Sequence, residues 1–232
     1  MREETINFWQ KILDAPQKNV TQKNVTQKNV TQKNDQTNRR LTVLLCPGFH
    51  DEALTAGFVR SLPAFVTAHT VTAFPANPFS TFEHLKYTFQ QQPVVAIGFS
   101  AGVVGLAGAL TIWQQQGGRI AKLIAIDGWG VPIVGIPASR MSHDLLTHWS
   151  SLPLDIATEK TDVNFYADPG VDHLMMWGAP EQVIGWQVNG WQVDGWQRPS
   201  ALTDALHINR KPTTAAAFIG QQLEQCLVAS GR

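Results

Sequence analysis

Residues 94–102 read VVAIGFSAG, and the residues after them are mostly small and apolar. The β-branched residues at 94–98 predict a short buried strand, and the Ala- and Gly-rich stretch that follows predicts a helix over 101–116. Two glycines, Gly117 and Gly118, supply the kind of residue at which a helix ends. The chain is therefore expected to pass from strand to helix at Ser100, inside a G-x-S-x-G sequence.

This strand-to-helix context gives the G-x-S-x-G sequence a chemical meaning. A sharp turn of this kind strains the serine backbone, so the residues two before and two after have to be small, as Gly98 and Gly102 are. Ser100 would then extend from the carboxyl edge of a sheet as a nucleophile. The backbone N–H of Ala101, at the start of the helix, would donate to an oxyanion.

Apolar strands alternate with helices on both sides of this motif, which predicts an α/β fold with a mostly parallel sheet and helices on both faces. The strands are expected at residues 41–46, 70–74, 94–98, 123–126 and 163–167. The helices are expected at residues 53–65, 80–89, 101–116 and beyond Pro212, where Phe218, Ile219, Leu223, Cys226 and Leu227 share one face. The helix at 80–89 would begin at an S-x-x-E capping box.

In these features the chain resembles the α/β-hydrolase superfamily over residues 41–228. The resemblance implies a small cap over the active site, at about 128–161, between the fourth and fifth recognised strands. It also implies a second oxyanion donor after the first strand, where PGFH stands at 47–50. The backbone N–H of Phe49 or His50 is therefore the candidate, although the fuller HGGG form of that sequence is absent.

A serine nucleophile needs an imidazole to accept its proton and a carboxylate to orient that imidazole. The superfamily order is serine, then acid, then histidine. Asp168 directly follows the fifth strand and His207 precedes the last helix, and these are the positions that the resemblance implies. The Asp-Pro and His-Ile-Asn sequences there are also similar to those of small serine hydrolases related to the retinoblastoma-binding hydrolase.

A second pair of residues competes for the same roles. His173 lies five residues beyond Asp168, and Asp127 ends the fourth strand. If His173 is the base, the acid is more plausibly Asp127, one strand away, so each histidine is tied to its own aspartate. We expect Asp168 with His207 and keep Asp127 with His173 as the alternative.

These residues predict a serine hydrolase that cleaves a carboxylic ester or thioester through an acyl-enzyme intermediate. The alternative is a non-catalytic protein of the same fold that binds a small molecule or a partner through the cap and a Trp-rich segment. No metal site or cofactor is expected, because phosphate loops, G-x-G-x-x-G and CxxC sequences are missing. His143 and His148 lack the H-E-x-x-H spacing, and Ser142 and Asp144 are typical of a helix start.

Composition narrows the class of protein further. The 232 residues carry 18 Lys and Arg against 18 Asp and Glu, so a strongly basic nucleic-acid binder is not expected. Two cysteines are too few for a disulfide framework, and the acidic N-terminus does not resemble a signal peptide, so we expect a cytoplasmic protein. Residues 94–113 carry no charge, but they divide into strand, turn and helix, so no membrane span is expected.

Two repeats with a period of five residues indicate how the chain is divided. Residues 17–34 repeat QKNVT, so residues 1–40 are expected to form an N-terminal helix and a low-complexity linker. Residues 41–232 would form the α/β-hydrolase domain. Residues 183–197 repeat V-x-G-W-Q within that domain, and a period of five fits neither strand nor helix, which predicts an expanded loop.

Overall fold

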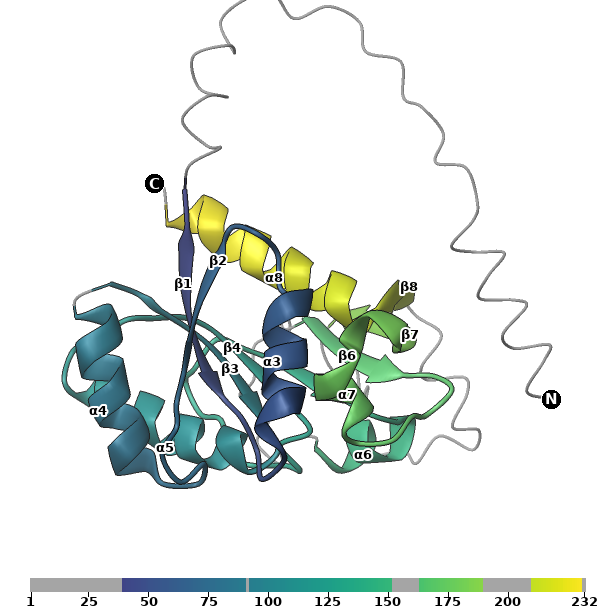
Figure 1. Ribbon diagram of the computed structural model, residues 1–232, viewed down its shortest axis with the longest axis horizontal. Coiled ribbons are helices and arrows are strands. Elements are labelled where there is room, and N and C mark those ends of the chain that lie inside the picture. Colours follow the sequence, from purple (N-terminus) through teal and green to yellow (C-terminus); the bar gives the residue numbers. More distant parts are fainter. Residues whose placement is uncertain (1–38, 91, 152–162, 190–209, 231–232) are drawn as a thin grey trace, which may run out of the picture.

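The computed structural model describes residues 39–90, 92–151, 163–189 and 210–230. Within these residues one sheet has eight strands in the order β2-β1-β3-β4-β5-β6-β7-β8 (Figure 1). The strands are β1 (Leu41–Cys46), β2 (Val66–Thr70), β3 (Val94–Phe99), β4 (Ile120–Ile126), β5 (Ala138–Ser142), β6 (Val163–Ala167), β7 (Ile184–Asn189) and β8 (Arg210–Thr214). Neighbouring strands from β2 to β6 pair in parallel, whereas β7 and β8 pair antiparallel.

Helices cover both faces of this sheet. They are α3 (Glu52–Ser61), α4 (Pro78–Phe89), α5 (Ala101–Gln115), α6 (Leu145–Ser150), α7 (Met175–Gly178) and α8 (Ala215–Ala229), with a 3-10 turn at Pro180–Gln182. Alternate side chains of β1 enter different cores: Val43 and Leu45 pack with α3 and α8, and Leu44 and Cys46 pack with α4 and α5. The α/β fold with a mostly parallel sheet is thus confirmed.

The chain reverses its direction of travel across the sheet between β1 and β3. From β1 it moves outward to β2 and then returns to β3 on the other side of β1. The helix after β1, α3, and the helix after β3, α5, pack on opposite faces. Open α/β sheets bind ligands in the crevice at the carboxyl ends of two such strands. Ser100, directly after β3, lies at this position.

Several predicted elements are present at the expected residues: β1, β3 and β6, and the helices α5 and α8. The strand predicted at 70–74 is wrong, because the chain pairs with β1 over Val66–Thr70 instead. The helix predicted at 80–89 begins earlier, at Pro78. Asn77 caps it by accepting hydrogen bonds from the N–H groups of Phe79 and Ser80, at 3.0 and 3.4 Å. An Asn cap followed by Pro at the first helical position therefore replaces the predicted capping box.

Part of the predicted cap, 128–161, is a strand of the sheet. β5 lies there between β4 and β6, and every one of its residues is buried although most are polar. Its polar groups find partners elsewhere in the chain: Ser139 Oγ donates to Gln222 Oε1 at 3.2 Å, the Arg140 guanidinium donates to the carbonyl of Val131 at 2.9 Å, and the Arg140 backbone N–H donates to Asn164 Oδ1 at 2.8 Å. Because these partners satisfy the polar groups, the strand is buried without an apolar sequence pattern.

The V-x-G-W-Q repeat also contributes a strand rather than only a loop. β7 contains Trp186, which is buried, donates from Nε1 to Asp168 Oδ2 at 2.9 Å and packs under the Arg210 guanidinium. The first copy of the repeat is therefore part of the sheet. The predicted N-terminal helix, the QKNVT repeat at 17–34 and the later part of the V-x-G-W-Q repeat lie outside the described residues.

Within the described residues, the structure has no helix that is both long enough and apolar enough to cross a membrane. The uncharged stretch 94–113 divides between β3 and α5, as the sequence predicts.

Gly102 lets α5 approach the loop after β1, and this contact predicts a measurable effect on stability. A Cβ on Gly102 would overlap the carbonyl oxygen of Cys46, whereas a Cβ on Gly220 in α8 would lie 3.7 Å from its nearest neighbour, Pro63. We expect Gly102→Ala to lower the free energy of unfolding by about 2 kcal/mol or more. The matched control Gly220→Ala should be neutral or stabilise by up to about 1 kcal/mol. Equal effects of the two substitutions in urea denaturation would contradict this packing.

Candidate active site

Ser100 occupies the turn between β3 and α5 in a strained conformation. Its φ of 54° and ψ of −123° lie in a region that non-glycine residues rarely adopt. The side chain stands at the N-cap position of α5 without capping the helix, and the residue is 8% exposed. A Cβ on Gly98 would lie 2.9 Å from Leu106 Cδ1 and 3.1 Å from the Val103 backbone, so a small residue is required there. The hydroxyl is thus free of a structural role in the helix.

The two predicted oxyanion donors lie on either side of this turn. Ala101 is the first residue of α5, so its N–H has no carbonyl one turn earlier in the helix to bond with. Gly48, in the loop after β1, is so close that a Cβ on it would lie 2.8 Å from Ser100 Cβ. Phe49 and His50 continue that loop, and Phe49 is 62% exposed. The loop expected to supply the second donor is therefore adjacent to Ser100.

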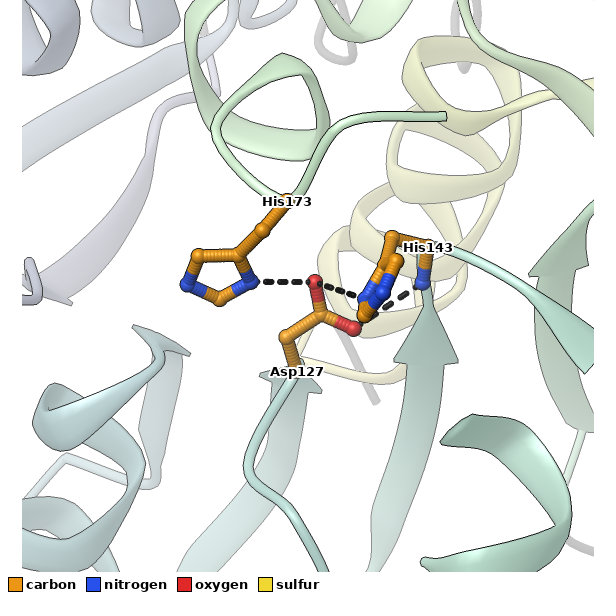
Figure 2. Close-up of side chains that lie close together, drawn as sticks. All are labelled: Asp127, His143 and His173. Atoms are coloured by element: carbon orange, nitrogen blue, oxygen red, sulfur yellow. Dashed lines mark hydrogen bonds and ion pairs between the residues drawn. The ribbon is translucent and has the colours of Figure 1, made fainter. Parts of the chain in front are cut away.

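Asp127 lies at the end of β4, the strand next to β3. The Ser100 N–H donates to the carbonyl of Ile126 at 2.9 Å, so Ser100 and Asp127 follow directly on a bonded strand pair. The Asp127 side chain is fully buried. Its carboxylate accepts three hydrogen bonds, two from His143 and one from His173 (Figure 2). A buried carboxylate requires such donors, because an unpaired charge in the interior is costly.

His173 is held by this carboxylate and by two aromatic rings. It lies in the loop between β6 and α7, and its Nδ1 is 2.8 Å from Asp127 Oδ2. The imidazole stacks on Phe99 with ring centroids 4.5 Å apart and on Trp129 at 5.2 Å. Because a carboxylate only accepts, Nδ1 carries the proton of this bond. No partner for Nε2 is found among the described residues, so this nitrogen is available for proton transfer.

His143, the first residue after β5, also belongs to this cluster, although its spacing to His148 gave no reason to expect a site there. Its backbone N–H donates to Asp127 Oδ1 at 2.9 Å, and its Nδ1 lies 3.0 Å from Asp127 Oδ2. Its Nε2 lies 3.4 Å from both Thr147 Oγ1 and Asp144 Oδ2. A histidine at the end of a central strand would have been a signal, but β5 itself was not recognised.

Asp144 lies at the start of α6, where the sequence predicts a helix start, and it also contacts His143 of this cluster. Burial raises the pKa of this carboxyl, but hydrogen bonds from Thr147 and the proximity of His143 outweigh burial and hold the pKa below its usual value. The carboxylate also accepts from the Thr147 N–H at 2.6 Å at the start of α6. Asp144 is therefore an anion beside His143 at neutral pH.

Of the expected pair Asp168 and His207, the structure describes Asp168. The Asp168 carboxylate accepts from Trp186 Nε1, and His207 lies outside the described residues. The structure thus joins the two members of the alternative pair, Asp127 and His173, while the pairing of Asp168 with His207 stays a prediction. Asp51, next to His50, accepts from the Ala53 N–H at 2.7 Å and caps α3.

Among the residues that the structure describes, Asp127, His143 and His173 could also hold a metal ion. One oxygen and two imidazole nitrogens lie within 4.8 Å of one another, and such donors suit a divalent transition metal. The sequence analysis did not predict this set, since the three residues are distant in the chain. In the geometry described, the Nδ1 atoms of both histidines are hydrogen-bonded to Asp127 Oδ2, at 2.8 and 3.0 Å, which satisfies the buried carboxylate.

Comparison with known proteins identifies no family for this chain. No protein-family model matches the chain, and no curated protein sequence matches it. The function of the chain therefore has to be inferred from the site itself.

His148 lies in α6 and is buried, which changes the pKa of its imidazole. Its ring packs against Tyr166 with centroids 5.2 Å apart, and only 1% of the residue is exposed. Burial, together with the positive charge of Arg140, lowers the pKa of His148 to about 4. The unfolded chain binds a proton at this residue near pH 6.5, so folding is opposed progressively as the pH falls from 6.5 towards 4.

Because the pKa of His148 is lower in the folded chain than in the unfolded chain, the protein should lose stability as the pH falls. A substitution of His148 should remove this part of the loss. Between pH 7 and pH 5 the His148 imidazole should cost the native state about 2 kcal/mol. We expect His148→Gln to be less stable than the wild type at pH 7 but to lose about 2 kcal/mol less on acidification. Urea denaturation at the two pH values measures this difference. Parallel losses in the two proteins would show that His148 is protonated in the native state.

Proposed function

We propose that the chain is a serine hydrolase of the α/β-hydrolase fold that cleaves a carboxylic ester or thioester through an acyl-enzyme intermediate. The observation that carries the proposal is the buried Asp127–His173 hydrogen bond beside the strand that ends in the strained Ser100. A nucleophile, a base and an orienting acid are thus supplied by neighbouring segments at one edge of the sheet. Ser100 also lies where the chain reverses its direction across the sheet between β1 and β3, which is where open α/β sheets bind ligands. This position supports the same proposal.

In this proposal His173 Nε2 accepts the proton of Ser100 while Oγ attacks the carbonyl carbon. Asp127 keeps the imidazole in the tautomer with a proton on Nδ1 and stabilises the imidazolium that forms. The N–H of Ala101 and the N–H of Phe49 or His50 donate to the oxyanion. Collapse of the intermediate breaks the bond to the alcohol or thiol, which leaves with the proton from His173. Water activated by the same histidine then releases the acid from Ser100.

The aromatic rings around His173 add to this argument. Protonation during the reaction places a positive charge between the faces of Phe99 and Trp129, and aromatic faces attract cations. Trp129 is 57% exposed and has a φ of 42°, so an apolar ring is held at the surface in a strained conformation beside the base. Such an arrangement is typical of a functional site rather than of a packed core.

A fluorophosphonate probe tests the proposed roles, because it reacts only with an activated serine. We expect the wild type to be labelled at Ser100 and Ser100→Ala not to be labelled. His173→Ala and Asp127→Asn should each slow labelling by roughly 10³-fold, because they remove the base or its orienting acid. The matched controls His207→Ala and Asp168→Asn should keep most of the wild-type rate.

Other labelling patterns would contradict the proposed roles. Slow labelling of His207→Ala and Asp168→Asn, with normal labelling of His173→Ala, would transfer the roles to the pair that the sequence favours. A wild type labelled no better than Ser100→Ala would refute the hydrolase and favour the non-catalytic binding protein. The unfolding free energy of each variant separates loss of chemistry from loss of fold.

A further inference from the structure

The acid of the proposed triad is bonded to two histidines, and only one of them has a role in the reaction. His143 and His173 both place Nδ1 within 3.0 Å of the same oxygen, Oδ2 of Asp127 (Figure 2). A triad needs a single imidazole on its acid. The second imidazole therefore requires an explanation of its own.

His143 contacts both oxygens of the carboxylate. Its backbone N–H donates to Oδ1 at 2.9 Å and its Nδ1 donates to Oδ2 at 3.0 Å. Two donors from one residue fix the plane of the carboxylate, which a single bond would leave free to rotate about Cβ–Cγ. Oδ2 consequently faces His173 in one orientation.

His143 is itself anchored on the other sides. Its carbonyl accepts from the Val171 N–H at 2.9 Å, which ties it to the loop that carries His173. Its Nε2 lies 3.4 Å from both Thr147 Oγ1 and Asp144 Oδ2. A neutral ring accepts there from the threonine and a protonated ring donates to the aspartate, and in both states Nδ1 keeps the proton that Asp127 accepts.

We propose that His143 is a positioning residue that acts through Asp127 and sets the orientation of the catalytic base His173. This inference depends on the proposed function. Its central consequence is that the Nδ1–H of His143, rather than the bulk or charge of its ring, determines the rate at which Ser100 reacts.

Substitution by asparagine isolates that N–H. The side-chain nitrogen of Asn is two bonds from Cβ, as Nδ1 of His is, so Asn can donate to Asp127 Oδ2 while it lacks the Nε2 contacts. His143→Ala removes both the side-chain donor and the Nε2 contacts. The backbone N–H that donates to Asp127 Oδ1 remains in His143→Asn and in His143→Ala. We expect His143→Ala to lower the maximal labelling rate by 10- to 100-fold at unchanged probe affinity, and His143→Asn to recover most of it. His69→Ala, on the exposed face of β2, is the control.

Three results would overturn the inference. The first is His143→Ala labelled within twofold of the wild type. The second is evidence of a purely structural role, given either by His143→Asn as slow as His143→Ala or by rates that follow the unfolding free energies. The third is an undiminished effect of His143→Ala in an Asp127→Asn background, where a residue acting through Asp127 should cause little further loss.

The failure of this inference is distinguishable from that of the hydrolase. A wild type that labels at Ser100, with any of these three results, refutes only the role of His143. A wild type that does not label refutes both, because no reaction then exists for His143 to support. If His143→Ala does not fold, the comparison of His143→Asn with His143→Gln decides, since the longer Gln side chain places its nitrogen one bond too far from Cβ.

Discussion

The carboxyl edge of the sheet is organised around one buried carboxylate. The Asp127 side chain is fully buried, and three N–H groups donate to its carboxylate. Two of these donors come from the end of β5 and the third from the loop after β6. Both segments have to be in register with β4 for the charge to be accommodated, so the same interaction that satisfies Asp127 also assembles the candidate site.

Strain is concentrated at the same edge. Ser100, Asp127 and Trp129 all have positive φ values, and backbone conformations of this kind cost about 1–3 kcal/mol each. The parallel strands with a core on each face stabilise these turns, because every strand that leads into the site is anchored by apolar side chains. The sheet thus holds Ser100 and Asp127 in backbone conformations that isolated loops would not adopt.

The sequence predicts the parts of this fold that bury apolar residues and misses those that bury polar ones. β1, β3 and α5 follow from their apolar pattern, and so does the turn at Ser100. β5 is not recognised because its buried polar side chains are satisfied by partners that no local pattern reveals: Ser139 bonds to Gln222, and the Arg140 guanidinium bonds to the carbonyl of Val131. Without β5, neither the position of His143 nor its contact with Asp127 can be inferred. Chain order alone also cannot choose between two aspartates and two histidines, since that choice depends on which loop folds back over the sheet.

The most direct test of this account is nuclear magnetic resonance of the protein with ¹⁵N-labelled histidine. A carboxylate shared by two imidazoles should give two downfield Nδ1–H protons that exchange slowly with water, assigned by their loss in His143→Ala and His173→Ala. Both should shift together in Asp127→Asn, whereas Asp168→Asn should leave them unchanged. Nδ1–H protons that exchange freely, or that respond to Asp168→Asn instead, would contradict the account.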